Sequence, residues 1–308
     1  MNPGKVLVSV VVVCFERVDG LRQTVAALEK QTFDDFELIA VDQTGLDELR
    51  TVVESARIRA RYVYCPIAGP PRNGRPASNA SHARNVGVLE SEAKIVAFTD
   101  DDCEPRPDWV EKITEPIRNN SDVVLVAGSS GTAEDKGTGS ETFHTDRSHP
   151  VFFPSMAGSS SLAARTDAFF DLGGFDTAMG PGTDVPGSED NHLIYRALRY
   201  ADSRGLRVAA RRDAVVDDAP LTKRSKLERS WRYMPCFGMY LRREFEDSGD
   251  EAARDAYRWH RHEHWLGIGR AFKKRSPYYM LYALVGGVRI VAGWHRRPIP
   301  PFVAEIGD

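Results

Sequence analysis

Residues 96–105 read VAFTDDDCEP, an apolar run that ends in three consecutive aspartates, Asp100, Asp101 and Asp102. The apolar part is typical of a buried strand, yet like charges repel and an unpaired carboxylate is costly to bury. Either water solvates the three carboxylates in a surface turn, or a cation lies beside them. The stretch therefore predicts a core strand whose end carries an acidic site.

The residues around this stretch alternate between strand and helix patterns. Three apolar runs are typical of strands buried on both faces: residues 8–14, 36–41 and 94–99. Two segments between them have apolar residues at helical spacing: residues 19–31 and 46–56. This alternation predicts an α/β protein with a parallel sheet and helices on both of its faces.

Ligands of such sheets bind beyond the carboxyl ends of the strands. Three polar segments follow strand ends in this chain: residues 14–17, 42–43 and 100–102. Two further segments, residues 65–81 and 129–149, are rich in Gly or Pro and lack periodicity, so we expect loops that close over substrates. Near residue 220 the composition changes to Arg, Trp, Tyr and His in long helical patterns, which predicts a boundary there.

Composition excludes several classes of protein. The chain has 308 residues and is 42% hydrophobic, which suits one large or two modest globular domains. Its net charge of −3 gives no overall basic field, so we expect no nucleic acid partner. The four cysteines are far apart and form no C-x-x-C, which fits a reducing cytosol better than a disulfide scaffold or a zinc site.

Two apolar segments bear on localisation. The start, MNPGKVLVSVVVV, lacks a small-residue cleavage site, so we expect no signal peptide. Residues 278–294 fall short of the ~20 residues that span a bilayer and contain Arg289. We expect a helix that docks on the protein or lies on a membrane surface. The prediction is a cytoplasmic protein, either free or peripheral at the inner face of the membrane.

The acidic triplet suits a metal ion. Two carboxylates separated by one residue can hold a hard divalent cation through oxygen ligands. Mn²⁺ or Mg²⁺ bound in this way keeps coordination positions open for phosphate oxygens and neutralises charge on a leaving diphosphate. A solvated acidic turn is the alternative.

The segment FTDDDCEPRPDW, residues 98–109, resembles the aspartate motif of the family-two inverting GT-A glycosyltransferases. Residues 8–45 resemble the opening strand–helix–strand of that family, and SHARNVGVLESEAKIVAF, residues 81–98, resembles its A-R-N-x-G helix. Two later segments resemble its G-G-F-D element and its E-D motif: AARTDAFFDLGGFD at 163–176 and GSEDNHLIYRAL at 187–198.

The resemblance covers about residues 7–210. It implies a GT-A fold, Rossmann-like, with a mostly parallel central sheet flanked by helices. Residues 1–220 would form the nucleotide-sugar-binding and catalytic domain. Residues 221–308 would form a helical extension on the acceptor side, and we leave open whether it contacts a membrane surface or a second copy of the chain.

The resemblance also implies roles for residues in the nucleotide-sugar and metal sites. Asp42 would contact the base or its ribose, and Arg84 the base or the diphosphate. Asp100 and Asp101 would bind ribose and shape the turn. Asp102 would be the principal ligand of Mn²⁺ or Mg²⁺, with Asp100 as a second ligand.

On the acceptor side, Asp190 would be the general base that deprotonates the acceptor hydroxyl, with Glu189 beside it. One carboxylate base and a metal-bound leaving group are sufficient for inversion, and a base of this kind contributes roughly 10²–10⁴-fold to the rate.

This chain departs from the family in the nucleotide pocket. Where the family usually has Pro-Thr-Tyr-Asn after the first strand, this chain has Val13, Cys14, Phe15 and Glu16. Cys14 and Glu16 are therefore candidate nucleotide contacts. The family often has a second aspartate after the base-binding one, and here that position is Gln43. The donor is left open among UDP-, GDP- and dTDP-sugars.

The C-terminal region contains WHRHEHW, which places three histidines close together: His260, His262 and His264. In some GT-A enzymes a C-terminal histidine is a third metal ligand, so His262 or His264 is a candidate, with His264 preferred. Packing or surface roles are the alternative.

Competing functions have distinguishable signatures. A non-catalytic nucleotide-sugar-binding relative, with a regulatory or scaffolding role, would not need both the acidic triplet and the E-D pair. A nucleotidyltransferase would have a Gly-rich basic segment after the first strand, and a dinucleotide-dependent oxidoreductase a G-x-G-x-x-G. The acceptor is left open among a glycan, a lipid-linked sugar and another hydroxyl compound.

Overall fold

The computed structural model describes residues 6–67, 77–131, 158–218, 222–273 and 277–295. It also gives the backbone of residues 141–144, together with Ile299 and Phe302.

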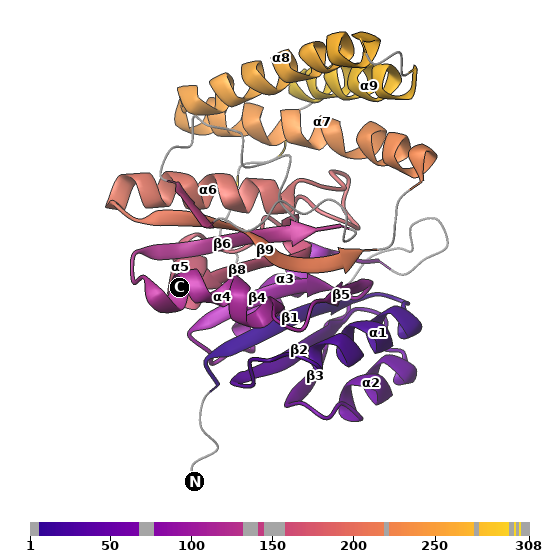
Figure 1. Ribbon diagram of the computed structural model, residues 1–308, viewed down its shortest axis with the longest axis vertical. Helices are drawn as coiled ribbons and strands as arrows, with labels where there is room; N and C mark the ends of the chain where they lie inside the picture. Colours follow the sequence, from indigo (N-terminus) through magenta and orange to yellow (C-terminus); the bar gives the residue numbers. More distant parts are fainter. Residues whose placement is uncertain are drawn as a thin grey trace.

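The molecule is built on a mixed, mostly parallel nine-stranded sheet (Figure 1). The strand order is β3-β2-β1-β4-β8-β6-β9-β5, and β7 pairs with β9. β8, β5 and β7 run antiparallel to their neighbours. The strands in chain order are β1 Val8–Cys14, β2 Phe36–Asp42, β3 Ala60–Tyr64, β4 Ile95–Asp100, β5 Cys103–Pro105, β6 Val123–Ser130, β7 Glu141–His144, β8 Leu162–Arg165 and β9 Arg207–Asp218.

The parallel half of the sheet places the three polar strand ends next to one another. Cys14 of β1 is in register with Asp42 of β2, and Val13 of β1 with Asp100 of β4. The predicted adjacency of these strand ends is therefore confirmed. It arises because β1 lies between β2 and β4 and all three strands run in the same direction.

Within the described residues, six helices cover the two faces of the sheet, and three more form an outer layer (Figure 1). The helices are α1 Val18–Leu28, α2 Asp47–Glu54, α3 Ala80–Leu89, α4 Trp109–Asn119, α5 Thr166–Asp171, α6 Glu189–Arg204, α7 Lys223–Ser248, α8 Glu251–Lys273 and α9 Pro277–Trp294. Val10 and Val12 pack with α1, α2 and α4, whereas Val11 belongs to the cluster with α3, α5 and α6. The alternation of side chains along β1 thus gives each face of the sheet its own core.

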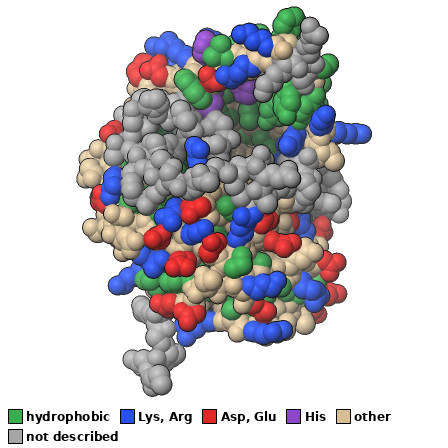
Figure 2. Space-filling model, viewed as in Figure 1, with side chains coloured by type: hydrophobic (Ala, Val, Ile, Leu, Met, Phe, Trp, Pro, Cys, Tyr) green, Lys and Arg blue, Asp and Glu red, His purple; other side chains and the backbone are tan. Residues whose placement is uncertain are grey.

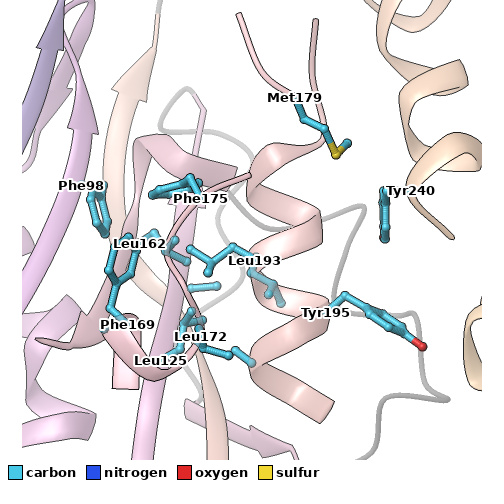
Figure 3. Close-up of a cluster of buried hydrophobic side chains, with 14 of the residues drawn as sticks. Phe98, Leu125, Leu162, Phe169, Leu172, Phe175, Met179, Leu193, Tyr195 and Tyr240 are labelled. Carbon is cyan, nitrogen blue, oxygen red and sulfur yellow. The ribbon is translucent and has the colours of Figure 1, made fainter. Parts of the chain in front are cut away.

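Figure 3 shows the cluster on the α6 side of the sheet. The rings of Phe98 and Phe175 meet edge to face with their centroids 5.2 Å apart, a favourable arrangement for aromatic pairs. Tyr240 of α7 belongs to the same cluster as Leu193 of α6. The outer helical layer therefore shares a core with the sheet.

Close backbone contact and buried polar pairs hold the outer layer in place. A Cβ on Gly293 of α9 would lie 1.9 Å from the carbonyl oxygen of Pro235 in α7, so only glycine permits this approach. His192 of α6 lies 2.7 Å (Nε2 to Oε1) from Glu244 of α7, and the Tyr195 hydroxyl donates to Asp250 at 2.7 Å.

Within the described residues, no helix combines the length and apolar character needed to cross a bilayer.

One of the two loops expected from the sequence contains a strand. Residues 129–149 are not all loop, because 141–144 form β7, which pairs with β9. The sequence of β7, ETFH, has one apolar residue and therefore shows no alternation of apolar and polar residues. Of the loop expected at 65–81, residues 68–76 lie outside the described residues, as do 132–140 and 145–149 of the other. The expected boundary near residue 220 falls between β9 and α7 and stays a prediction.

Candidate active site

A cavity of about 1660 Å³ lies between the carboxyl edge of the sheet and the helices α7–α9. Its sheet-side wall contains the acidic triplet, the loop after β1, the turn at Gly158–Ser160 and the start of α6. Its helical wall is made by side chains of α7, α8 and α9. Single ligand sites usually enclose ~300–1,000 Å³, so the cavity has room for two substrates.

The three aspartates of the triplet occupy different environments. Asp101 is buried, and its carboxylate accepts hydrogen bonds from the Phe15 amide (3.1 Å) and the Arg17 guanidinium (3.0 Å). Burial raises the pKa of Asp101 to about 6, against the opposing effects of the Phe15 hydrogen bond and the Arg17 charge. Asp101 therefore holds the β1–α1 loop onto the triplet.

Asp102 is the open member of the triplet. Its side chain is 44% exposed, and Arg17 Nη1 lies 2.5 Å from its Oδ2. A guanidinium at this place shows that the carboxylate already attracts a cation. This contact was not foreseen from the sequence, because residues 17 and 102 are far apart along the chain.

The donor atoms at this turn fit a hard divalent cation. Asp100, Asp102 and Cys103 each offer a ligand atom within 4.8 Å of the others. Burial raises the pKa of the Cys103 thiol far above its usual range, and its sulfur is a soft ligand that hard cations disfavour. Two carboxylates therefore remain, a set that suits Mg²⁺ or Mn²⁺ and leaves coordination positions for phosphate oxygens.

His264 is not part of this group. Among the described residues, the only potential ligands gathered with the triplet are Asp100, Asp102 and Cys103. His264 lies on the helical wall of the cavity, beside Gly286 of α9. The structure does not bring it to the carboxylates.

Only some of the residues at the end of β1 and just after it line the cavity. Val13, Phe15 and Glu16 line it, but Cys14 is buried in the core cluster with Val10. Alternate side chains of a strand point to opposite faces, so Val13 and Cys14 cannot both reach the cavity. Glu16 is exposed and has a left-handed backbone (φ 60°), which turns the chain from β1 into α1.

Asp42 is occupied by its own turn. Its carboxylate accepts hydrogen bonds from the Thr44 amide and hydroxyl, the Gly45 amide and the Tyr62 hydroxyl, all within 2.6–2.8 Å. Asp42 is fully buried and does not line the cavity, whereas Gln43 does. At the end of β2 it is therefore Gln43, and not Asp42, that lines the cavity.

Arg84 connects the two acidic motifs. This buried residue of α3 donates to Asp100 Oδ1 (2.9 Å) and to Glu189 Oε1 (3.2 Å). Its Nε is buried without a hydrogen-bond partner among the described residues, and the residue lines the cavity. The A-R-N-x-G helix is placed by Asn85, which exchanges two 2.8 Å hydrogen bonds with the backbone of Phe175.

Glu189 and Asp190 begin α6 at the cavity. Burial raises the pKa of Glu189 to about 7, with the Asp190 charge acting in the same direction and Arg84 opposing. The preceding residue, Ser188, has a left-handed backbone (φ 70°). Glu16 and Ser188 are the non-glycine residues with positive φ in the described part of the chain, and both line the cavity. Such conformations cluster at functional sites.

Asp190 is positioned by its neighbours. The Asn191 amide donates to its Oδ1 at 2.6 Å, and the Ser159 amide to its Oδ2 at 3.3 Å. A Cβ on Gly158 (φ +55°) would lie 2.0 Å from that Oδ2. The turn at Gly158–Ser160 was missed from the sequence; its only signal was a glycine before consecutive serines.

The helical wall is basic and aromatic. Arg229 and Arg232 of α7 lie over the Tyr233 ring, with Cζ 5.9 and 5.6 Å from its centroid. His260 of α8 is buried on this wall, and its Nε2 has no hydrogen-bond partner in the part of the chain that is described. Figure 2 shows hydrophobic, basic and histidine side chains together on the helical layer at the top of the view.

Known proteins resemble this chain in sequence. Residues 9–161 match the sequence model of glycosyl transferase family 2. The glucosyl-dolichyl phosphate glucuronosyltransferase of Haloferax volcanii is 25% identical over 221 residues, 67% of each chain. The pre-mycofactocin glycosyltransferase of Mycobacterium tuberculosis is 29% identical over 188 residues, 58% of this chain but only 37% of that protein.

A solved structure shares the architecture. The mannosyltransferase PcManGT from Pyrobaculum calidifontis, in complex with GDP-Man and Mn²⁺, has a TM-score of 0.59 at 17% identity. The match covers 96% of this chain and 89% of that one, including the helical layer. The GT-A fold expected from the sequence is confirmed, and residues 9–161 of the chain belong to glycosyl transferase family 2.

Proposed function

We propose that this protein is a metal-dependent inverting glycosyltransferase, in which Asp190 is the general base and Asp102 holds the metal–diphosphate of a nucleoside-diphosphate sugar. The Arg84 bridge is the observation that carries the proposal. One buried guanidinium contacts Asp100 of the triplet and Glu189 beside Asp190. The donor-side and acceptor-side carboxylates are thus held in one cavity.

Two features support Asp190 as the general base. Its hydrogen bonds with Asn191 and Ser159 orient the carboxylate, and the N-terminus of α6 favours a negative charge there. As the acceptor oxygen attacks the anomeric carbon, Asp190 would accept the hydroxyl proton. The bond from that carbon to the diphosphate oxygen breaks on the opposite face, and the leaving diphosphate takes the electron pair.

Asp100 and Asp102 would hold Mn²⁺ or Mg²⁺. When bound, the ion neutralises negative charge that develops on the leaving diphosphate. Arg17, whose side chain is 56% exposed beside Asp102, would add a positive group on the same side.

Contacts and known relatives suggest donor and acceptor classes. We keep the base or ribose contact at the end of β2, where Gln43 lines the cavity. The Gln43 amide exchanges hydrogen bonds with the Asn79 backbone (3.1 and 3.0 Å), and the Asp42 carboxylate is occupied by its turn. A protein of the same fold was solved with GDP-Man and Mn²⁺, so GDP is tested together with UDP and dTDP. The Haloferax volcanii relative is named for glucosyl-dolichyl phosphate, so we propose a lipid-linked sugar as the first acceptor to test.

The test is thermal unfolding of the full chain with UDP, GDP or dTDP, each with and without Mn²⁺. A ligand at 100 times its Kd adds about 2.7 kcal/mol of stability. We expect stabilisation that requires Mn²⁺ for one nucleotide and that Asp102→Asn removes. Asp19→Asn is the matched control, because the Asp19 side chain is 98% exposed on the neighbouring α1. Stabilisation by every nucleotide without Mn²⁺, or its full retention in Asp102→Asn, would contradict the metal role.

A further inference from the structure

Charge is divided unequally between the sheet and the helical layer. Residues 221–308 contain 17 Lys and Arg against 10 Asp and Glu, a net charge of +7. Residues 1–220 contain 24 Lys and Arg against 34 Asp and Glu, a net charge of −10. The small overall charge therefore hides an acidic segment, residues 1–220, followed by a basic one, residues 221–308.

Several basic residues gather at one end of that layer. Lys223 at the start of α7 lies over the Tyr278 ring at the start of α9, with Nζ 5.5 Å from the centroid. The end of α8, at Lys273, is four residues before Pro277, the first residue of α9. The start of α7, the end of α8 and the start of α9 thus form one end of the layer, which we call the basic end. It carries Lys223, Lys226 and Lys273, together with Arg224 and Arg270, which pair with Glu228 (2.8 Å) and Glu263 (2.9 Å).

Large hydrophobic side chains are exposed on the same helices. In the described part of the chain, three large exposed hydrophobic residues lie elsewhere: Leu46, Tyr64 and Leu89. Eight lie on α7–α9: Trp231, Trp265, Leu266, Phe272, Tyr279, Leu281, Leu284 and Val288. Phe272, beside Lys273, is 71% exposed, the largest value of the set.

The exposed residues of α9 form a stripe. Leu281, Leu284 and Val288 are three and four residues apart, which places them on one face of the helix. Tyr279 is exposed and also lines the cavity, and Arg270 of α8 lines the cavity nearby in the basic end. The exposed apolar surface is therefore continuous with the mouth of the cavity.

We propose that the basic end of α7–α9, with the exposed residues Phe272, Leu281 and Leu284, docks on an anionic lipid bilayer and receives a lipid-borne acceptor from it. This inference rests on the proposed glycosyl transfer only for the role of the acceptor. Apolar and aromatic side chains mixed with Lys and Arg are typical of surfaces that lie in the headgroup region. Each Lys or Arg near such a surface contributes to attraction by anionic lipid.

A bilayer fits this surface better than a second copy of the chain. A symmetric dimer through this face would place the same basic patch, with Lys223, Lys226 and Lys273, on both sides of the interface. Like charges at short range are unfavourable. Anionic headgroups instead complement the charge while the acyl region accepts the apolar side chains.

Vesicle flotation tests the proposal on the full-length chain. We expect the wild type to float with vesicles of phosphatidylcholine and phosphatidylglycerol (7:3) and to remain unbound with phosphatidylcholine alone. Phe272→Ser combined with Leu281→Ser should weaken binding at least tenfold, since both side chains are exposed and would lose their insertion. Lys226→Gln combined with Lys273→Gln should weaken it several-fold.

Leu89→Ser is the matched control, because Leu89 is 57% exposed on α3, away from the helical layer. Its binding should equal that of the wild type. Failure of the wild type to float with anionic vesicles would overturn the proposal, as would equal losses in the control and the double variants. Light scattering that shows a wild-type dimer converted to a monomer by the Phe272 and Leu281 changes would assign the face to a second copy.

The two proposals fail separately. Asp190→Asn should float like the wild type even though it cannot transfer sugar. The Phe272 and Leu281 double variant should keep the stabilisation by nucleotide and Mn²⁺. If nucleotide binding is absent in every protein but flotation follows the expected pattern, the docking surface stands and the proposed transferase function does not.

Discussion

The two walls of the cavity are built in different ways. On the sheet side, each aspartate of the triplet contacts a guanidinium, from Arg17 or Arg84. On the helical side, His260 is buried without a hydrogen-bond partner for Nε2 within the described residues, and arginines lie over aromatic rings. The sheet side has a paired, closely positioned set of charges, as a site for bond-making requires, whereas the helical side has the mixed character that suits an amphiphilic ligand.

The largest expected effect comes from Asp190, the proposed base on the sheet side. Asp190→Asn should lower the transfer rate by roughly 10²–10⁴-fold and leave nucleotide binding unchanged, because the amide cannot accept the proton. Transfer of labelled sugar and nucleotide-dependent unfolding measure the two properties. Asp202→Asn, an exposed residue of the same helix, is the control. If Glu189→Gln alone shows the loss, the base is Glu189.

A glycine pair tests whether the position of Asp190 matters apart from its charge. Gly158→Ala should reduce transfer about 10²-fold, because a Cβ there would lie 2.0 Å from Asp190 Oδ2 and displace the carboxylate. Gly205 has a similar left-handed φ of +66°, but a Cβ added there would have open space around it, with nothing within 4 Å. Gly205→Ala should therefore lose about 1 kcal/mol of stability from backbone strain alone and keep full activity. Equal activity losses in both variants would contradict a steric effect on Asp190.

His260 of the helical wall should make the free energy of unfolding depend on pH. Burial, with a smaller effect of His264, lowers the pKa of His260 from 6.5 to about 3. Between these values the unfolded chain binds a proton that the folded chain does not. Stability should therefore fall as the pH drops from 6.5 towards 3, by up to about 1.4 kcal/mol per pH unit from this residue.

Urea unfolding at several pH values measures this slope. His260→Gln should flatten it, whereas His262→Gln, on the exposed face of α8, should leave it unchanged. If stability depends on pH equally in the wild type, His260→Gln and His262→Gln, then His260 is accessible to protons in the folded state.

The smallest expected effect concerns Arg17, whose guanidinium lies beside Asp102 on the sheet side. Arg17→Gln removes the guanidinium from Asp102, so Mn²⁺ added without nucleotide should bind about fivefold more tightly, since a half-exposed ion pair is worth at most about 1 kcal/mol. Electron paramagnetic resonance of free Mn²⁺ measures this directly. Arg22→Gln on α1 is the control, because Arg22 pairs with the exposed Asp19, at 4.0 Å, rather than with the triplet. Weaker Mn²⁺ binding in Arg17→Gln would mean that Arg17 does not compete with the ion.

Much of the sheet could be predicted from the sequence because its strands are local apolar runs. The apolar runs at β1, β2 and β4 indicated buried strands. Because parallel strands end at the same edge of a sheet, the three strand ends were expected to lie close together. The same reasoning predicted that the triplet lies at the edge of a cleft.

The finer geometry of the site could not be predicted, because it depends on partners distant in sequence. Asp42 is held by Tyr62, twenty residues away, and Arg84 meets Glu189 across 105 residues. Cys14, which we expected to contact the nucleotide, is buried in the core, because strand alternation places Val13 on the cavity instead. The burial of Cys14 could have been predicted from the sequence, because alternate side chains of β1 point to opposite faces of the sheet.

The burial of all four cysteines has a practical consequence. Cys14, Cys65, Cys103 and Cys236 are free thiols, each at most 8% exposed. The folded protein should therefore react slowly with thiol reagents, and a single cysteine introduced at position 272 would be the fast-reacting one. A fluorophore or spin label attached there would report the depth of that side chain in a bilayer, against a native background that stays silent until the protein unfolds.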